Sequence, residues 1–240
     1  MFRSKIKFIN IINPLLHVLV MGTAFLGCTK VIEPDLNDFG LQYYPTSLGD
    51  YRIYYTKTIR HNLDGSIDTT QYLVKEVAED SVIYSDGNAR ILLGRYSREI
   101  AGSTWQKDSI WAVLINNSNV IMSEANVDYV KLSFPVLESK KWDGNATNNN
   151  ESEYYKLIDL ENSYAYDTLT FENTLTVVQK DLLDPAKITE DDYRIEVYAA
   201  GIGLIHKLKI KINYCSNCVE NGKIEDGFIF EQKLIEFGKE

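Results

Sequence analysis

The chain is poor in the residues and motifs on which most enzymes depend. Its 240 residues include only three cysteines and three histidines. After residue 27, no Gly-x-Ser-x-Gly or Ser-x-x-Lys motif supplies an activated nucleophile. No His-Glu-x-x-His motif and no second Cys-x-x-Cys pair offers the three or four ligands of a zinc site. We therefore predict no catalytic residue, no metal and no cofactor, and a protein that is not an enzyme.

Positive charge is also scarce. The chain has 25 Lys and Arg against 34 Asp and Glu, a net charge of −9. Binding to nucleic acid needs a basic patch that displaces counterions from phosphates, so we expect no nucleic-acid partner. No segment after residue 27 is long and apolar enough to cross a bilayer as a helix.

The first 27 residues have the composition of a secretory signal. Arg3, Lys5 and Lys7 form a positively charged start without an acid, and residues 8–25 form a short apolar stretch interrupted by polar residues. Such a stretch suits a cleaved signal better than a membrane-spanning helix. Without it the chain has 22 Lys and Arg against 34 Asp and Glu, a net charge of −12.

The apolar stretch ends in Leu26-Gly27-Cys28, which resembles the lipobox of bacterial lipoproteins. In that family the cysteine becomes the first residue and its sulfur carries a diacylglycerol. The resemblance implies a signal peptide over residues 1–27, a lipid anchor on Cys28 that holds the protein at a membrane, and an acidic tether over residues 28–40. Thr29 stands where an Asp would resemble an inner-membrane retention signal, so we expect the outer membrane of the cell envelope. The alternative is a buried cysteine in a simple cleavable signal.

Removal of Cys28 from the count leaves two cysteines, Cys215 and Cys218. An even number suits an oxidising compartment. A redox Cys-x-x-Cys usually opens a helix, whereas this pair follows a predicted strand and no helical pattern is nearby. We predict a structural disulfide that closes the loop before Phe228, with a redox pair and free thiols as alternatives. So small a loop contributes about 2 kcal/mol in the chain-entropy model.

Alternation of apolar and polar residues with a period of two recurs from residue 41 to the end of the chain. This pattern is typical of strands with one buried face. Turn signals such as Asp64-Gly65 and Asp86-Gly87-Asn88 separate the alternating segments. The predicted strands are Tyr51–Ile59, Thr69–Ala78, Ser81–Ser85, Ala89–Tyr96, Trp105–Ile115, Val120–Glu124, Val127–Phe134, Glu153–Leu160, Leu169–Gln179, Tyr193–Ala199, Leu204–Tyr214 and Phe228–Phe237.

These strands predict an all-β, single-domain fold over residues 41–240. The sequence has no long amphipathic helix, and a parallel sheet would need crossover helices. The expected architecture is therefore an antiparallel barrel, half-barrel or sandwich with little helix. The asparagine-rich stretch from Lys140 to Glu153 is predicted to be an exposed loop.

The clearest alternation lies in Leu204–Tyr214. One face carries Lys207, Lys209 and Lys211, which we expect to be solvated, with contact to an acidic lipid or glycan as the alternative. We predict that the other face is buried and that its histidine, His206, lies in the core or lines a cavity rather than acting as a base. That face consists of Leu204, His206, Leu208, Ile210, Ile212 and Tyr214.

Four short phrases resemble a diffuse set of Bacteroidota lipoproteins of unknown function. Residues 44–54 (YPTSLGDYRIY) are similar to the opening segment of that set, and residues 131–135 (KLSFP), 142–145 (WDGN) and 196–204 (EVYAAGIGL) resemble three later phrases. The resemblance implies a lipid-anchored, β-rich envelope protein and carries no catalytic residues.

Three functional hypotheses follow. The first is a lipocalin-like or half-barrel interior, lined by His206 and Leu208, that binds a small hydrophobic ligand. The second is a surface glycan-binding or interaction protein that uses Trp142, because this tryptophan lies in a polar stretch where its ring could stack on a sugar. The third is a hydrolase with paired carboxylates, which need no sequence motif.

Overall fold

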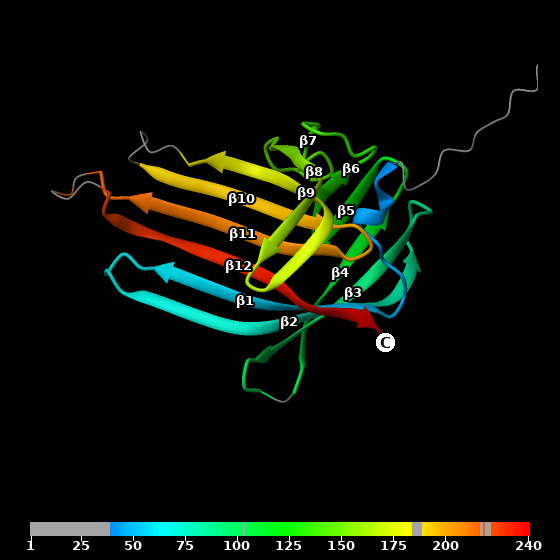
Figure 1. Ribbon diagram of the computed structural model, residues 1–240, viewed down its shortest axis with the longest axis horizontal. Coiled ribbons are helices and arrows are strands. Elements are labelled where there is room, and N and C mark those ends of the chain that lie inside the picture. Colours follow the sequence, from blue (N-terminus) through cyan, green and yellow to red (C-terminus); the bar gives the residue numbers. More distant parts are fainter. Residues whose placement is uncertain (1–38, 103, 184–188, 217, 219–221) are drawn as a thin grey trace, which may run out of the picture. The chain divides into compact units, whose positions relative to one another are not determined.

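The computed structural model describes residues 39–102, 104–183, 189–216, 218 and 222–240. In these residues twelve strands form one continuous sheet, and every pairing between neighbouring strands is antiparallel (Figure 1). The prediction of an all-β, antiparallel single domain with little helix is therefore confirmed. The predicted signal peptide, Cys28 and most of the tether lie outside the described residues.

The elements follow one another along the chain with short connections. A 3₁₀ turn, η1 (Leu41–Tyr43), precedes the sheet. No helix in the described segments has the length and apolar content needed to span a bilayer. The strands are β1 (Asp50–His61), β2 (Ile67–Ile83), β3 (Ala89–Glu99), β4 (Gln106–Ile115), β5 (Asn119–Glu124), β6 (Val127–Ser133), β7 (Lys141–Asp143), β8 (Tyr154–Tyr166), β9 (Leu169–Leu182), β10 (Glu190–Ala199), β11 (Gly203–Tyr214) and β12 (Ile224–Lys239).

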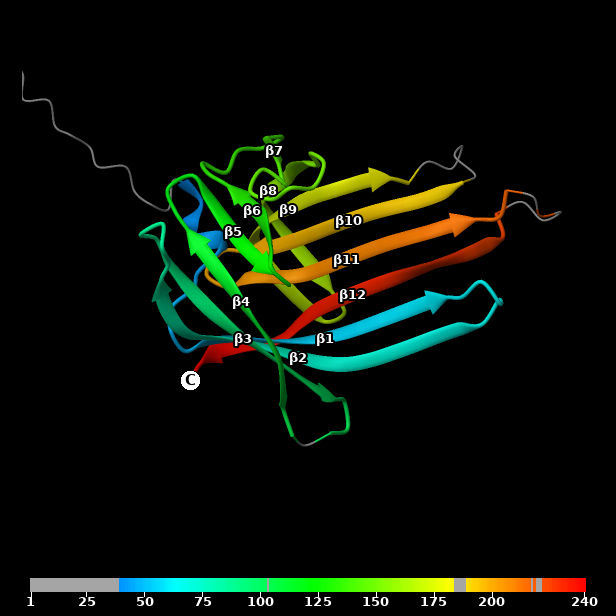
Figure 2. The same ribbon diagram turned by 180° about the vertical axis from the view of Figure 1, so that it is seen from behind.

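The sheet consists of two meanders joined at their centre. Its strand order is β6-β5-β4-β3-β2-β1-β12-β11-β10-β9-β8-β7, so the first strand pairs with the last. Seen from the other side, β3–β6 run steeply across the direction of β1 and β10–β12 (Figure 2). The sheet thus curls until its two edge strands meet.

The two edges are joined by hydrogen bonds, which makes the described domain a nearly closed barrel. The backbone N–H of Val130 in β6 donates to the carbonyl of Gly144, which follows β7, over 2.9 Å. The indole Nε1 of Trp142 in β7 donates to the carbonyl of Val130 over 2.9 Å. This seam satisfies backbone groups that an open edge would leave unpaired.

Both faces of the sheet are partly buried. The concave face encloses the larger apolar cluster, which includes Tyr43, Leu132, Leu157 and Tyr198. On the convex face the hairpin of β8 and β9 lies across β10–β12 (Figure 1), where Phe171 packs with Val197 and Ile205. A strand such as β11 therefore has protein on both sides, which period-two alternation alone does not reveal.

One predicted strand boundary is wrong. Thr69–Ala78 and Ser81–Ser85 are predicted as separate strands, but β2 runs without a break over 17 residues. The register with β3 shifts between Ala78 and Asp80, so Glu79 is an extra residue in a bulge. The bulge changes the alternation without ending the strand, which is why the pattern resembles two strands.

Candidate functional site

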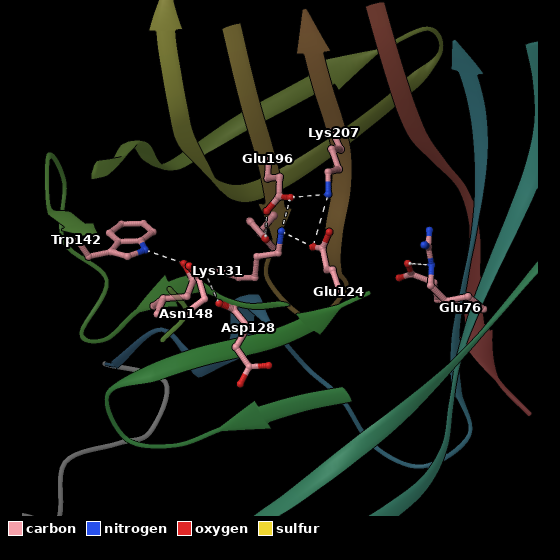
Figure 3. Close-up of polar contacts among 11 residues, drawn as sticks. Glu76, Glu124, Asp128, Lys131, Trp142, Asn148, Glu196 and Lys207 are labelled. Carbon is pink, nitrogen blue, oxygen red and sulfur yellow. Dashed lines mark hydrogen bonds and ion pairs between the residues drawn. The ribbon is translucent and has the colours of Figure 1, made fainter. Parts of the chain in front are cut away.

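Four charged side chains from two regions of the sheet meet inside the barrel. Glu124 ends β5, Lys131 lies in β6, Glu196 in β10 and Lys207 in β11 (Figure 3). Glu196 is 1% exposed, Lys131 5% and Lys207 7%. We refer to these four residues as the ionic cluster.

The ionic cluster is held by short ion pairs. The Nζ of Lys131 lies 2.9 Å from Oε1 of Glu196 and 2.5 Å from Oε1 of Glu124. The Nζ of Lys207 lies 2.9 Å from the same Glu196 oxygen. Tyr198 donates its hydroxyl to the other oxygen of Glu196 over 2.6 Å. Each buried charge thus has a partner of opposite sign, without which its burial would be prohibitive.

The pKa values follow from this pairing. Burial by itself raises the pKa of Glu124, but Lys131 and Lys207 outweigh it and lower the pKa to about 2. The same balance places the pKa of Glu196 well below its ordinary value. Burial by itself lowers the pKa of Lys131, but the carboxylates of Glu124 and Glu196 outweigh burial and raise the Lys131 pKa. Glu124, Glu196 and Lys131 are therefore ionised at neutral pH. With two carboxylates and two lysines, the formal charges of the ionic cluster balance.

A second ion pair lies beside the ionic cluster. The Nε of Arg95 in β3 is 3.0 Å from Oε1 of Glu76 in β2, and its guanidinium stacks 3.6 Å above the centre of the Trp111 ring. Between this pair and the ionic cluster lies a small cavity of about 20 Å³. That volume accommodates about one water molecule.

A larger open cavity lies above these ion pairs on the concave face. Its volume is about 350 Å³. Four aromatic rings, two ionic-cluster residues and several further cations line it, from β1–β5, β11 and β12. The lining residues are Thr58, Arg60, Tyr72, Val74, Arg95, Trp111, Glu124, Lys207, Lys209, Phe228, Phe230 and Gln232. We refer to this space as the concave cavity.

The floor of the concave cavity is an ordered set of rows across three strands. In β11 the inward residues are the lysines, in β12 they are Gln232 and two phenylalanines, and in β1 they are two threonines and an arginine. Side chains that face one another across paired strands lie within contact distance. The rows are Lys207–Gln232–Thr56, Lys209–Phe230–Thr58 and Lys211–Phe228–Arg60.

The lysine row of β11 corrects one sequence prediction. We expected Lys207, Lys209 and Lys211 on a solvated face, but all three point to the concave face, and Lys207 is buried there. Lys209 is half-buried and only Lys211 is exposed. The alternation was identified correctly, but the choice of the inner face was wrong, because the opposite face is covered by the β8–β9 hairpin.

Trp142 is not the exposed aromatic ring that the sequence suggested. It is 8% exposed, packs edge-on against Tyr155 and donates to Val130 at the seam. The stretch from Lys140 to Glu153 is thus not simply an exposed loop, since it contributes β7 and part of the barrel closure. Figure 3 shows the indole pointing toward the seam, where Asn148 also donates to the carbonyl of Asp128.

His206 and Leu208 lie on the convex face and do not line the concave cavity. A bulge in β11 places Ile205 and His206 on the same side, next to Tyr164 and Tyr166 of the covering hairpin. His206 is bonded through Nδ1 to the Tyr164 hydroxyl over 2.7 Å. Burial lowers its pKa, although Glu231 opposes this. His206 is therefore a buried structural residue, as the sequence analysis favoured, but on the other face from the cavity.

Cys215 and Cys218 form a disulfide with Cα atoms 5.6 Å apart. The bond lies just after β11 and before β12, far along the strands from the ionic cluster. Among the residues described, no group of three or more His, Cys, Asp or Glu side chains is arranged to hold a metal ion.

The ionic cluster has no acid–base pair of the kind that glycoside hydrolases use. Those enzymes need one protonated carboxylic acid beside one carboxylate. The pKa values of Glu124 and Glu196 are both lowered, so neither holds a proton to donate at neutral pH. The arrangement suits binding and orientation rather than proton transfer by these two groups.

Glu124, Lys131 and Glu196 are not among the site residues predicted from the sequence. Each lies in a predicted strand, but a single charge in an alternating segment has the same appearance whether it faces solvent or a buried partner. One signal was present: Lys131 and Glu196 each open one of the phrases shared with the lipoprotein set, KLSFP and EVYAAGIGL.

Comparisons with known proteins give two structural matches. A crystal structure of a candidate exported protein with a YmcC-like fold from Bacteroides fragilis aligns with 81% of this chain and 98% of its own, at 14% identity and a TM-score of 0.42. A candidate lipoprotein from Parabacteroides distasonis aligns with 82% of this chain and 98% of its own, at 12% identity and a TM-score of 0.35. No family model and no curated protein matches the chain.

Proposed function

We propose that this is an exported lipoprotein, anchored through Cys28 to the outer membrane, that binds a small ring-containing hydrophobic ligand in its concave cavity without catalysing a reaction. The observation that supports this is the cavity itself. At about 350 Å³ it falls within the ordinary range of small-molecule sites. Tyr72, Trp111, Phe228 and Phe230 supply aromatic walls, and the ionic cluster gives the cavity a rigid polar base.

Blocking the cavity tests the proposal. Thr58 points into it from β1, and the next residue, Ile59, points to the opposite face. The change Thr58→Trp should fill the space, while Ile59→Trp adds the same ring outside it; both are compatible with a strand. We expect N-phenylnaphthylamine, a neutral dye that fluoresces in apolar sites, to bind the wild type and Ile59→Trp, and to bind Thr58→Trp at least about tenfold more weakly.

Two outcomes would count against the proposal. If the dye does not bind the wild type, the cavity is not an apolar ligand site. If Thr58→Trp and Ile59→Trp bind it equally, the dye occupies another place on the molecule. Circular dichroism of each variant shows whether the sheet is retained.

A second candidate function, glycan binding, is favoured by an exposed ring in an open cleft. Tyr154 is 70% exposed and lines a cleft of about 780 Å³ together with Asn145, Asn150 and Lys180. Amide, ammonium and aromatic groups together suit a sugar, which presents hydroxyls and an apolar ring face. In affinity electrophoresis through polysaccharide gels, Tyr154→Ala should lose any retardation of the wild type, and Tyr154→Phe should keep it.

A further inference from the structure

The cations of the concave cavity divide into two classes. Lys207 is paired with Glu196, and Arg95 is paired with Glu76. Lys209 and Arg60 line the same space, but within the described residues neither forms an ion pair with a carboxylate. The cavity therefore has a surplus of positive charge.

The surroundings of Lys209 make its charge costly in the empty protein. Lys207, two residues away on the same face, and burial together lower the pKa of Lys209 to about 8. Arg194 in β10 faces Lys209 in the β10–β11 pair, and it is a cation already paired with Asp192 and Glu153. A negative group beside Lys209 would remove this repulsion, so the empty cavity favours an anion.

Arg60 stands at the other side of the phenylalanine floor. Its guanidinium lies 5.8 Å from the centre of the Phe228 ring. Asp68 faces it across the β1–β2 pair, but the carboxylate of Asp68 accepts a hydrogen bond from Asn62 instead. Because one strand separates β11 from β1, their backbones are about 10 Å apart, and two long cationic side chains can reach a group between them.

We propose that the ligand of the concave cavity is an amphipathic anion, with a carboxylate or phosphate bound by Lys209 and Arg60 and an apolar ring system lying on Phe228 and Phe230. This inference rests on the proposed function and adds the chemical class of the ligand. The unpaired cations would supply charge-assisted hydrogen bonds, and the phenylalanines would supply apolar contact. The chain as a whole is acidic, so this positive cavity is a local feature and not part of a general basic surface.

Three naphthalene probes of matched shape test the charge requirement. Naphthoate carries a carboxylate, naphthyl phosphate carries a phosphate, and naphthalenemethanol is neutral. We expect isothermal titration calorimetry at neutral pH to give an affinity at least about tenfold higher for one or both anions than for the alcohol. The better anion identifies the head group, and the preference should fall as salt is added.

Variants of Lys209 and Arg60 test whether these two cations bind the anionic group. Lys209→Met and Arg60→Met should each reduce the anion-to-alcohol affinity ratio by about fivefold or more, and leave the affinity for the alcohol nearly unchanged. The matched control is Lys57→Met, which removes a lysine from the opposite face of β1. Lys209→Met removes a charge that repulsion already disfavours, so we expect it to fold; Lys209→Arg keeps the charge and should keep the preference.

Raising the pH provides a second readout. Lys209 loses its proton above about pH 8 in the empty protein, so the anion preference should decline through that range in the wild type and stay flat in Lys209→Met. The other charged groups that influence Lys209 keep their protonation there, because the carboxylate pKa values are low and the Lys131 and Arg194 pKa values are raised. These groups are Glu124, Lys131, Arg194 and Glu196. Lys207 also faces Lys209, from the same strand, and is paired with Glu196.

The outcomes separate this inference from the proposed function. If the alcohol binds in the cavity as tightly as both anions, or if Lys209→Met and Arg60→Met behave like Lys57→Met, the ligand is not an anion held by these cations, although the cavity still binds apolar rings. If none of the probes and no neutral dye binds, both proposals fail.

Discussion

Glu196 shows how much one buried charge depends on its neighbours. Its carboxylate accepts hydrogen bonds from Lys131 and Tyr198 and forms an ion pair with Lys207. Removal of one member of a buried ion pair leaves an uncompensated charge, which is usually more destabilising than removal of the whole pair. The ionic cluster therefore behaves as a unit.

The change Glu196→Gln should lower the free energy of unfolding by about 3–5 kcal/mol, because two lysines would then share the single carboxylate of Glu124. Urea titration followed by circular dichroism measures this. The control is Lys239→Met, whose lysine is 63% exposed and 3.9 Å from Asp50. Such surface pairs contribute roughly 1 kcal/mol or less. Equal losses in the two variants would contradict a stabilising role for the cluster.

Acid should weaken the fold through the same carboxylates. The pKa of Glu124 is about 2 in the folded protein and ~4.3 in an unfolded chain. A group whose folded pKa is lowered contributes its full stability above the unfolded pKa and loses it as the pH falls toward the folded pKa. Between pH ~5 and ~3 the wild type should therefore lose more unfolding free energy than Glu124→Gln. Parallel curves for the two proteins would show that Glu124 is not linked to folding.

At the scale of elements, closure of the barrel depends on a strand of three residues. β7 is too short to be recognised by alternation, yet it carries Trp142, whose Nε1 satisfies the carbonyl of Val130. Gly144 follows directly, and a Cβ there would collide with the ring of Tyr155. The seam thus requires a hydrogen-bonding ring and a residue without a side chain within three positions.

The change Trp142→Phe keeps an aromatic ring but removes the indole donor. We expect a loss of about 1–2 kcal/mol in unfolding free energy, because the carbonyl of Val130 would lose a buried partner. Trp105→Phe is the matched control, since Trp105 is only half-buried and stacks with Arg98. If both substitutions cost the same, the loss comes from ring size and not from the seam hydrogen bond.

Most strands could be predicted because local alternation and Asp-Gly turns are properties of neighbouring residues. Nearly every predicted strand overlaps a strand of the sheet, from β1 to β12. The inner face of β11 could not be predicted, because Lys207 and His206 are both buried and only the covering hairpin decides which one meets the cavity. The ionic cluster was equally hidden, since it joins residues 124 and 131 to residues 196 and 207, and their proximity follows from barrel closure.

At the scale of the whole molecule, the expected localisation of the protein at a membrane depends on the lipid anchor proposed at Cys28. If the lipid anchor is correct, Cys28→Ser should move the protein from the membrane fraction to the soluble fraction, and the wild type should take up labelled palmitate. A mutant that remains in the membrane fraction, together with a wild type that takes up no label, would overturn the anchor. We expect the substitution to leave the unfolding free energy of the described domain, which starts at residue 39, unchanged.

The pairing of β1 with β12 determines when the molecule can become functional. Residues 224–239 form β12, which joins the two meanders at the centre of the sheet. Phe228 and Phe230 of β12 are the floor between Lys209 and Arg60. During synthesis neither the sheet nor the cavity can be completed until this last strand is available. Residues 39–223 therefore cannot complete the sheet or the cavity floor until residues 224–239 have also been made.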